Sequence, residues 1–409
     1  MTTRRALISG ASIAGPALAF WLSEAGWDVT VVERAERLRT SGYPVDIRGT
    51  AIDVVRRMGL HDQIVAEHYR HVPIAVLSPR GHRLSTVDIG RVANDPTSGD
   101  VEITRGVLSE ILYRASRNHA TYLFGDSITS LTQTATSVDV TFERHQAQTF
   151  DVVIGADGIH SNVRRLTFGD ESQFVRHLGP YAAIWDLPGE IISAGTGFMY
   201  SHPGRTITVE RPISGGPARV FLAFVHPDPG AVNRHDTDEI LRTVRRAFTG
   251  DRWRTTEILD TLPGAEDLYF DTVSQVRMDR WSHGRVALIG DAAYAPAFLS
   301  GQGTSIAIAG AYLLASELAQ HDQPESAFAA YERRLRAYVE KNQNLALRTD
   351  STVIARTPGQ LLRRNIKMVV APWLQRLGLL HLLQTKLRTA ATDLSLTSHD
   401  LQRACSTNR

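Results

Sequence analysis

Three short segments, far apart in the sequence, carry residue types that can bind a dinucleotide. Gly10-Ala11-Ser12-Ile13-Ala14-Gly15 lies near the N-terminus, Gly155-Ala156-Asp157-Gly158 near the middle, and Gly290-Asp291-Ala292-Ala293 is followed by Gly301-Gln302-Gly303. Glycines permit close backbone approach to phosphates, and a helix N-terminus offers free amide N–H groups to an anion. One such fingerprint is a weak signal, but the ordered combination indicates a single site built from several segments.

The spacing within the first segment indicates what each residue would contribute. Gly10 allows a tight turn after a strand, and Gly15 lets the following helix pack closely against that strand. Ser12 replaces the second glycine of the usual pattern, which lowers the specificity of the match. Glu33 lies 23 residues after Gly10, where an acidic side chain can accept hydrogen bonds from ribose hydroxyls. A glycine-rich helix start in another α/β fold is the competing interpretation.

Short apolar segments are expected to position these glycines as buried strands. They cover residues 6–9, 28–32, 150–154 and 285–289. The pattern also predicts a helix that stops at Gly26 and another that runs from the Gly301 segment to about Leu318. Arg4 and Arg5, followed by small and apolar residues, are also compatible with a signal peptide, but the strand–helix–strand pattern favours a folded α/β unit.

Composition and charge restrict the class of ligand. The 409 residues are 43% hydrophobic and 22% charged, with a formal net charge of +2. We therefore expect a small-molecule ligand, no nucleic acid and no membrane insertion, in a monomer or homodimer. Cys405 is the single cysteine, which rules out an intramolecular disulfide and favours a cytoplasmic location. The 15 histidines show no metal-ligand spacing, so no metal site is expected.

In order and approximate spacing, the three segments resemble the signatures of class A flavoprotein monooxygenases with the para-hydroxybenzoate hydroxylase fold. The resemblance covers roughly residues 4–345 and implies an α/β fold: a Rossmann-type FAD-binding domain with an inserted β-sheet substrate domain and a C-terminal helical segment. Within this family, the chain resembles the compact tetracycline-inactivating members in its length and in the stretch from Gly42 to Asp46. The expected divisions are 1–72, 96–172 and 276–345 for the FAD-binding domain, 73–95 and 173–275 for the substrate domain, and 346–409 for the C-terminal helices.

The resemblance also implies cofactor contacts. The stretch from Ser41 to Gly49 is similar to the family's loop beside the flavin, Arg105 to an arginine near the FAD phosphates and ribose, and Asp291 to a carboxylate on the ribose or pyrophosphate side. Solvated helix-start cations are the alternative for Arg48 and Arg105. The expected FAD contacts are Gly10, Ser12, Ile13, Ala14, Gly15, Glu33, Arg34, Asp46, Arg48, Arg105, Asp157, Gly290, Asp291, Gly301, Gln302, Gly303 and Thr304, with Arg39 as an NADPH contact.

Two parts of the pattern leave alternatives or depart from the family. Asp157 is similar to a residue that serves FAD, but a plain strand-to-helix turn, with Ser161 or Asn162 capping the next helix, explains the Asp-Gly pair equally well. Tyr294 stands where family members often have histidine, and Pro296 lies farther upstream of the Gly-Gln-Gly run than is usual. The loop between Tyr294 and that run is therefore expected to shape the flavin face differently.

The residues between the motifs supply a substrate-binding sheet. Residues 74–89 are typical of a hairpin, and residues 174–275 include alternating strands. Aromatic strand residues belong to a core more often than to a pocket. Candidate pocket residues are Phe198, Met199, Tyr200, Phe221 and Phe224. The expected substrate contacts are Arg211, for an anionic or enolic group, together with Phe221 and Phe298.

The C-terminal segment differs from the rest in charge. Residues 354–409 contain nine Lys/Arg and two Asp, which makes this segment +7. Its apolar positions approximate helical spacing with an expected break at Pro372. A helix packed on the protein is the favoured interpretation, and binding to a membrane surface is the alternative.

The reaction implied by the resemblance is hydroxylation in two halves. NADPH or NADH reduces FAD, and the reduced flavin captures O2 as a C4a-hydroperoxide that oxygenates an electron-rich aromatic or polyketide-like molecule, tetracyclines included. The flavin performs the chemistry, and the sequence names no side chain as a catalytic acid or base. The alternatives are an FAD-dependent reductase or dehydrogenase, a flavin halogenase, and a non-enzymatic flavin-binding module.

Overall fold

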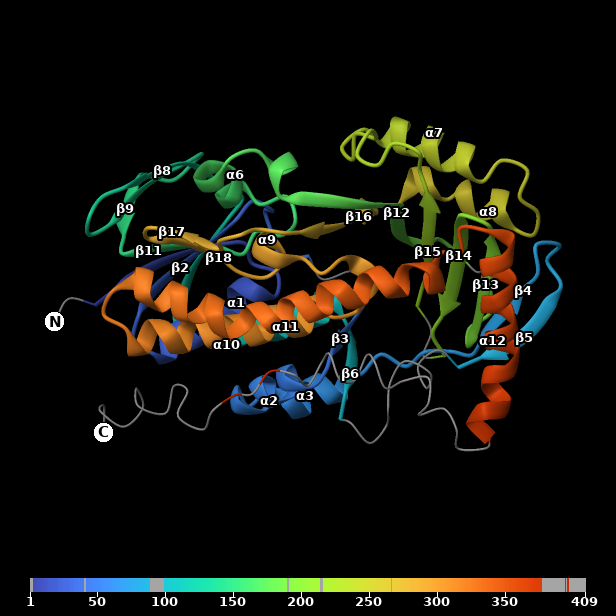
Figure 1. The fold of residues 1–409 in the computed structure, drawn as a ribbon, viewed down its shortest axis with the longest axis horizontal. Coiled ribbons are helices and arrows are strands. Elements are labelled where there is room, and N and C mark those ends of the chain that lie inside the picture. The colour runs from blue at the N-terminus through green and yellow to red at the C-terminus, as the bar shows by residue number, and fades with distance from the viewer. Residues whose placement is uncertain are drawn as a thin grey trace.

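Two sheet-based parts lie side by side along the long axis of the molecule in the computed structural model (Figure 1). The structure describes residues 3–39, 42–88, 99–189, 191–213, 216–265, 267–376, 394 and 396. One part is built on a six-stranded sheet with long helices, and the other on a seven-stranded sheet. This arrangement is the α/β architecture with an inserted substrate sheet that the sequence predicted.

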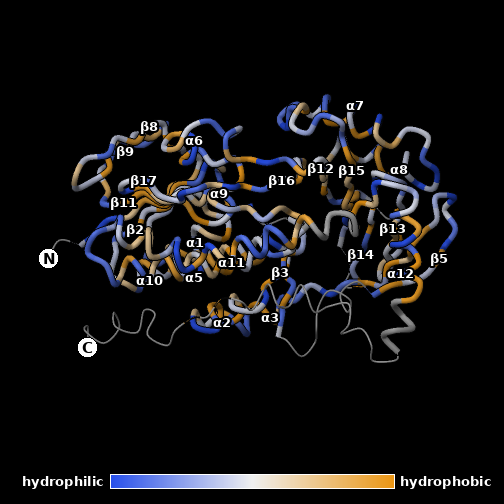
Figure 2. Tube along the Cα trace, in the orientation of Figure 1, coloured by the Kyte–Doolittle hydropathy of each residue, from blue (hydrophilic) through white to orange (hydrophobic). Residues whose placement is uncertain are grey.

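The six-stranded sheet has the strand order β17-β18-β11-β1-β2-β7. Its strands are β1 (Arg5–Ser9), β2 (Asp28–Glu33), β7 (Ala120–Phe124), β11 (Val152–Gly155), β17 (Ser282–His283) and β18 (Val286–Leu288). All neighbours are parallel except the edge strand β17. Leu7 and Ile8 are fully buried, as expected for a parallel strand covered on both faces. Figure 2 shows hydrophobic residues concentrated around β11.

Helices cover one face of this sheet, and a small antiparallel sheet lies on the other (Figure 1). The helices are α1 (Ala14–Glu24), α2 (Thr50–Arg57), α3 (His61–Ala66), α5 (Arg105–Ser116), α10 (Gly303–Gln320) and α11 (Pro324–Val353). The opposite face carries β8 (Ile128–Gln133), β9 (Val138–Phe142), β10 (Gln148–Phe150) and α6 (Asn162–Phe168). Helix α1 packs against α5 and α10. The N-terminal segment is therefore a strand and helix of the core, as its pattern predicted.

The seven-stranded sheet has the order β16-β12-β15-β14-β13-β4-β5. Its strands are β4 (Ile74–Leu77), β5 (Arg83–Val87), β12 (Val175–Leu187), β13 (Thr196–His202), β14 (Arg205–Arg211), β15 (Ala218–Val225) and β16 (Tyr269–Val276). The expected hairpin is confirmed as β4 and β5. One face forms a core with α7 (Thr237–Ala247) and α8 (Thr255–Leu259) that includes Trp185 and Phe224. The other face packs Phe221 near Ala297 and Ala346 of the first part.

The remaining elements are short, apart from the last helix. They are β3 (Pro44–Ile47), β6 (Val101–Thr104), η1 (Glu171–Gln173), η2 (Leu262–Gly264), α9 (Asp291–Tyr294), η3 (Phe298–Ser300) and α12 (Pro358–Arg376). Helix α12 packs against β5 and β13, so this part of the C-terminal segment is a packed helix, as expected. It continues past Pro372, and the break expected there is wrong. No helix within the described ranges is both long and apolar enough to cross a bilayer.

Tyr294 is directed into the packing between α10 and α11. Its side chain is buried, and its hydroxyl lies 2.8 Å from that of Tyr331. The Trp281 ring is 4.7 Å away, centroid to centroid. Gly310 makes room for this arrangement, because a Cβ there would lie 2.3 Å from the Tyr294 hydroxyl oxygen. The residue that departs from the family pattern thus stabilises the helix layer.

The contact at Gly310 gives a test of this packing. Gly310→Ala is expected to lower the free energy of unfolding by about 1–3 kcal/mol, because the added methyl overpacks the Tyr294 hydroxyl. Gly359→Ala is the control, since no atom lies within 4 Å of a Cβ at this exposed helical position. Urea unfolding of both variants measures the difference. An equal effect of the two substitutions would contradict the assigned contact.

Candidate functional site

Two glycines hold the turn between β1 and α1 against the neighbouring chain. Gly10 has a φ of 107°, and a Cβ on it would lie 2.5 Å from the carbonyl oxygen of Ala156. A Cβ on Gly15 would lie 1.9 Å from the carbonyl oxygen of Gly10. Any side chain at either position would therefore push the turn away from β11 or from the helix. The first two motifs of the sequence meet at this contact.

Glu33 orders the same turn from the end of β2. One carboxylate oxygen accepts a hydrogen bond from the backbone N–H of Ala11 at 2.8 Å, and the other accepts from the N–H of Ala35 at 2.9 Å. Each oxygen retains a second lone pair for a ligand hydroxyl. No side chain caps the start of α1 at Ile13, so the first amides of this helix are open to an anion.

Arg105 joins the turn to the loop before β3. Its guanidinium Nη2 donates to the Ser12 hydroxyl at 3.0 Å, and its backbone N–H donates to the carbonyl oxygen of Tyr43 at 3.0 Å. The interpretation of Arg105 as a solvated cation does not hold, because these two contacts fix it between two chain segments. Its positive charge also opposes the rise in the pKa of Asp291.

Asp291 follows β18 and opens α9. Its side chain is exposed, although Gly290 and Ala292 on either side are buried. Burial of the surroundings raises the pKa of the Asp291 carboxyl, and Arg105 lowers it. One carboxylate oxygen lies 3.6 Å from the position of a Cβ on Gly303, at the start of α10. A solvent-accessible carboxylate beside an open helix start is suited to a polar ligand.

The strand β3 packs on the start of α10. Asp46 and Arg48 form an ion pair of 2.7 Å, and Arg48 is 6% exposed. The Arg48 N–H donates to the Ser305 hydroxyl at 3.0 Å, and that hydroxyl donates to the Asp46 carbonyl at 3.2 Å. A Cβ on Gly301 would lie 2.8 Å from the Asp46 carboxylate. Burial raises the pKa of Asp46 to about 7 against the opposing charge of Arg48.

Asp157 has structural hydrogen bonds on both carboxylate oxygens. It accepts from the Ser161 hydroxyl at 2.5 Å and from the N–H groups of Asn162 and Val163 at 2.8 and 3.1 Å. Ser161 caps α6, as one of the sequence interpretations predicted, by accepting from the N–H of Arg164. These contacts are those of a strand-to-helix turn, and they place Asp157 next to Ser9 at the end of β1.

Four aromatic rings meet between the two parts of the molecule. The ring of Phe298 stacks on those of Phe221 and Tyr269 and meets the edge of Tyr43 at a centroid distance of 4.7 Å. Ala297, just before Phe298, has a φ of 85°, a conformation that costs a non-glycine residue about 1–3 kcal/mol. The sequence had singled out Phe221 and Phe298, and the structure brings them together.

Other predicted residues lie elsewhere. Arg211 is on the opposite sheet face from Phe221, and its guanidinium donates to the carbonyls of Ile192 and Gly216. Of the candidate pocket residues, Met199 shares the face of Phe221 by strand register. The members on the core face are Phe198, Tyr200 and Phe224. The last two predicted residues are arginines that were expected to contact FAD and NADPH. Both are exposed and follow β2, outside the aromatic cluster: Arg34 and Arg39.

The residue just before α10, Gln302, has a buried side-chain amide. Gln302 is fully buried, and its side-chain oxygen and nitrogen have no hydrogen-bond partner within the described part of the chain. Its backbone N–H donates to the Ser300 hydroxyl at 3.1 Å, and Thr304 beside it is buried. Buried amides are usually satisfied, so this one marks a place where a bound group or water completes the structure.

Sequence reasoning missed three residues of this site. Tyr43 lies inside the loop that was expected beside the flavin, and its position one residue before β3 is the signal that could have identified it. Ser305 follows the Gly-Gln-Gly run by two residues, which places its hydroxyl in the first turn of α10. Tyr269 carried no local signal, because only strand pairing brings β16 to the cluster.

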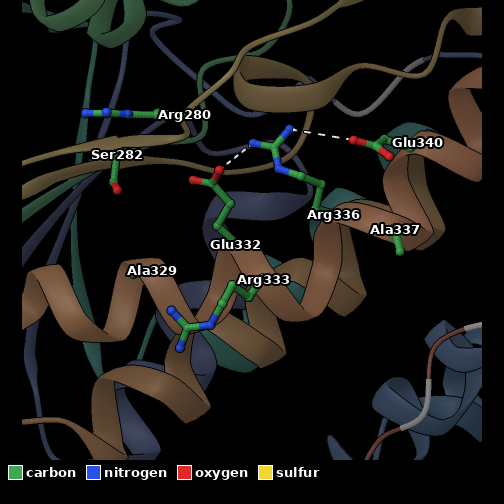
Figure 3. Close-up of a pocket in the computed structure, with 8 residues that line it drawn as sticks. All are labelled: Arg280, Ser282, Ala329, Glu332, Arg333, Arg336, Ala337 and Glu340. Atoms are coloured by element: carbon green, nitrogen blue, oxygen red, sulfur yellow. Dashed lines mark hydrogen bonds and ion pairs between the residues drawn. The ribbon is translucent and has the colours of Figure 1, made fainter.

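A surface hollow of about 590 Å³ lies elsewhere, between α11 and the segment from Arg280 to Ser282 (Figure 3). Arg336 in its wall forms ion pairs with Glu332 and Glu340. None of the residues predicted for cofactor or substrate lines this hollow.

Several known proteins are similar to this chain in sequence. Residues 3–346 match the model of a family described as FAD binding domain. A flavin-dependent monooxygenase from an unknown prokaryotic organism is 34% identical over 358 residues, which cover 87% of this chain and 92% of the relative. An uncharacterized protein of Mycobacterium tuberculosis is 42% identical over 356 residues, covering 82% of this chain and 91% of that protein.

A solved structure extends the similarity to the whole fold. The crystal structure of tetracycline destructase Tet(55) is 31% identical and superposes with a TM-score of 0.82, covering 97% of this chain and 99% of that one. The chain therefore belongs to the FAD-binding family of flavin-dependent monooxygenases.

Proposed function

We propose that this enzyme is an NAD(P)H- and O2-consuming monooxygenase that hydroxylates an electron-rich aromatic or polyketide-like small molecule, with a tetracycline as the first compound to test. The observation that carries the proposal is the position of the aromatic cluster between the glycine-rich site and the substrate sheet. The similarity to tetracycline destructase Tet(55) over 97% of this chain supports the choice of substrate class.

The residues present fit FAD. The uncapped amides of α1 and the Arg105 guanidinium would hold the pyrophosphate, and Glu33 would accept from a ribose hydroxyl. Asp291 would bind the polar chain between pyrophosphate and ring. Asp46 and Arg48 would flank the ring beside the start of α10, where the glycines Gly301 and Gly303 keep the backbone accessible.

FAD supplies the redox chemistry when bound, and the chain supplies binding, orientation and exclusion of water. The start of α10 would place backbone N–H groups where negative charge develops on the flavin ring. Phe298 and Phe221 would hold a planar substrate over the ring by stacking. The phenolic oxygens of Tyr43 and Tyr269 stay protonated at neutral pH, because burial raises both pKa values, and can donate to substrate oxygens.

The FAD contacts can be tested by substitution. Gly10→Val and Asp291→Ala are each expected to lower the fraction of FAD-loaded protein about tenfold or more, since one displaces the turn and the other removes a ligand carboxylate. Asp139→Ala, an exposed carboxylate on β9, should retain full loading. The ratio of flavin to protein absorbance measures occupancy. Full occupancy in both site variants would refute the assignment.

Two phenylalanines on β15 separate the substrate face from the core face. Phe221→Ala is expected to raise KM about tenfold and to increase the fraction of NADPH that ends as hydrogen peroxide, with little change in the unfolding midpoint. Phe224→Ala should instead destabilise the fold by about 3–5 kcal/mol, because Phe224 is buried in the core. Steady-state kinetics and thermal unfolding of both variants measure the contrast. Reversed or identical profiles would place the substrate elsewhere.

The reaction itself is tested by NADPH consumption in air, with peroxide counted, across phenols, aromatic polyketides and a tetracycline. The expected result is one compound that accelerates NADPH loss, keeps peroxide low and gains the mass of one oxygen atom. If a compound accelerates NADPH loss but gains no oxygen, and an added electron acceptor is reduced instead, the enzyme is a reductase and the proposal is wrong.

A further inference from the structure

A partly buried histidine lies between two carboxylates where the two parts of the molecule meet. His71, just before β4, places its Nε2 2.7 Å from a carboxylate oxygen of Glu102 on β6. Its Nδ1 lies 3.0 Å from a carboxylate oxygen of Glu210 on β14. Glu102 and Glu210 are 8% and 9% exposed. The imidazole can satisfy both carboxylates only when both of its nitrogens carry protons, so the geometry is that of a cation bridging two anions.

Glu102 also belongs to the strand pair that carries the expected flavin contacts. In the antiparallel pair of β3 and β6, Asp46 lies directly opposite Glu102. Like charges at such positions destabilise a strand pair. Each carboxylate has its own cation here, because Arg48 pairs with Asp46 and His71 pairs with Glu102. Among the charges acting on Asp46, Glu102 raises its pKa and His71 lowers it.

Glu210 lies on the sheet face that carries the aromatic cluster. Strand register places Glu210 opposite Arg219 on β15, two residues from Phe221. The Tyr69 hydroxyl donates to the other oxygen of Glu210, and the Tyr69 ring packs on His71 with centroids 5.0 Å apart.

The charged and titratable groups around His71 come from every element that meets there. They are Glu102 and Asp100 beside β6, Asp46 and Arg48 at β3, Glu210 on β14, Arg219 on β15, and Tyr69.

We propose that His71 is a positioning residue, which as a cation between Glu102 and Glu210 fixes the strand carrying Asp46 and Arg48 relative to the sheet face carrying Phe221. The inference rests on the proposed function, because it concerns how the flavin and substrate faces are held in register. Without the cation, Glu102 and Glu210 face each other across the interface with no shared donor, and Glu102 faces Asp46 across the strand pair. The strand pair then moves away from the sheet, and the flavin site loosens.

The pH dependence follows from the same geometry. Burial lowers the pKa of His71, but hydrogen bonds and charge from Glu102 and Glu210 outweigh burial and raise it to about 10. A histidine whose pKa is raised on folding stabilises the protein fully below its unfolded pKa of about 6.5 and loses this effect as the pH rises toward 10. The bridge is therefore complete at neutral pH and weakens in alkaline solution.

The test is the FAD dissociation constant of wild-type and His71→Gln holoenzyme between pH 7 and 10, measured by release of flavin fluorescence. At pH 7 we expect His71→Gln to bind FAD about tenfold more weakly. The ratio of the two constants should fall as the pH rises to 10, because wild type has lost about half of the same charge when the pH reaches the raised pKa of His71. Titration of the flavin itself cancels from this ratio. His145→Gln is the matched control, since His145 pairs with Asp126 beside the small antiparallel sheet.

A second variant distinguishes a specific loss of FAD binding from a general loss of folding. Glu210→Gln keeps the shape of the side chain and removes only the charge on the substrate sheet, so it should weaken FAD binding in the same direction. In a double-mutant cycle its effect should not add to that of His71→Gln. Unchanged FAD affinity in both variants, a His71→Gln ratio that does not vary with pH, or a thermal destabilisation without any change in FAD affinity would each overturn the proposal.

These outcomes are separable from failure of the proposed function. FAD affinity and its pH profile do not depend on which reaction the flavin performs. With a substrate in hand, His71→Gln should also increase the peroxide fraction at pH 7 about tenfold over that of His145→Gln. If no compound stimulates NADPH consumption by wild type, the function is wrong and the affinity measurement still decides the role of His71.

Discussion

The close packing of the turn after β1 on the turn after β11 is the constraint on which the site depends. Gly10 and Gly15 both contact carbonyl oxygens at distances that leave no space for a Cβ. This contact sets where α1 begins, and therefore where its open amides point. Glu33 can reach the Ala11 amide, and Arg105 can reach Ser12, only because the turn is held there. The remaining residues of the site are arranged around this turn between β1 and α1.

Charge balance is the second requirement, because the site collects several acidic groups, of which Glu102 is buried and Asp291 is exposed. Asp291 is balanced by Arg105, Asp46 by Arg48 and Glu102 by His71. Unpaired buried carboxylates would take up protons or drive the segments apart. Arg105 and His71 also join segments that are distant in sequence, whereas Arg48 pairs with an acid two residues away.

A second histidine bridges two carboxylates at the interface between the two parts. His160 lies 2.8 Å from Glu171 on one side and 2.8 Å from Asp271 of β16 on the other, and hydrogen bonds to the two acids outweigh burial and raise its pKa. Like His71, it places a cation between a carboxylate of the first part and one of the substrate sheet. Strand alternation then decides the role of each aromatic residue on β15, since Phe221 faces this interface and Phe224 faces the core.

The sequence by itself determined the central strands, the glycine turns and the cofactor class, because these depend on local spacing and on conformations that glycine favours. It also indicated Arg105 through resemblance and Phe298 as a candidate aromatic contact. Only the tertiary structure decided that Arg211 faces away from Phe221 and that His71 joins two acids. The first outcome depends on strand register and the second on contacts between residues more than 30 positions apart, which no local pattern records.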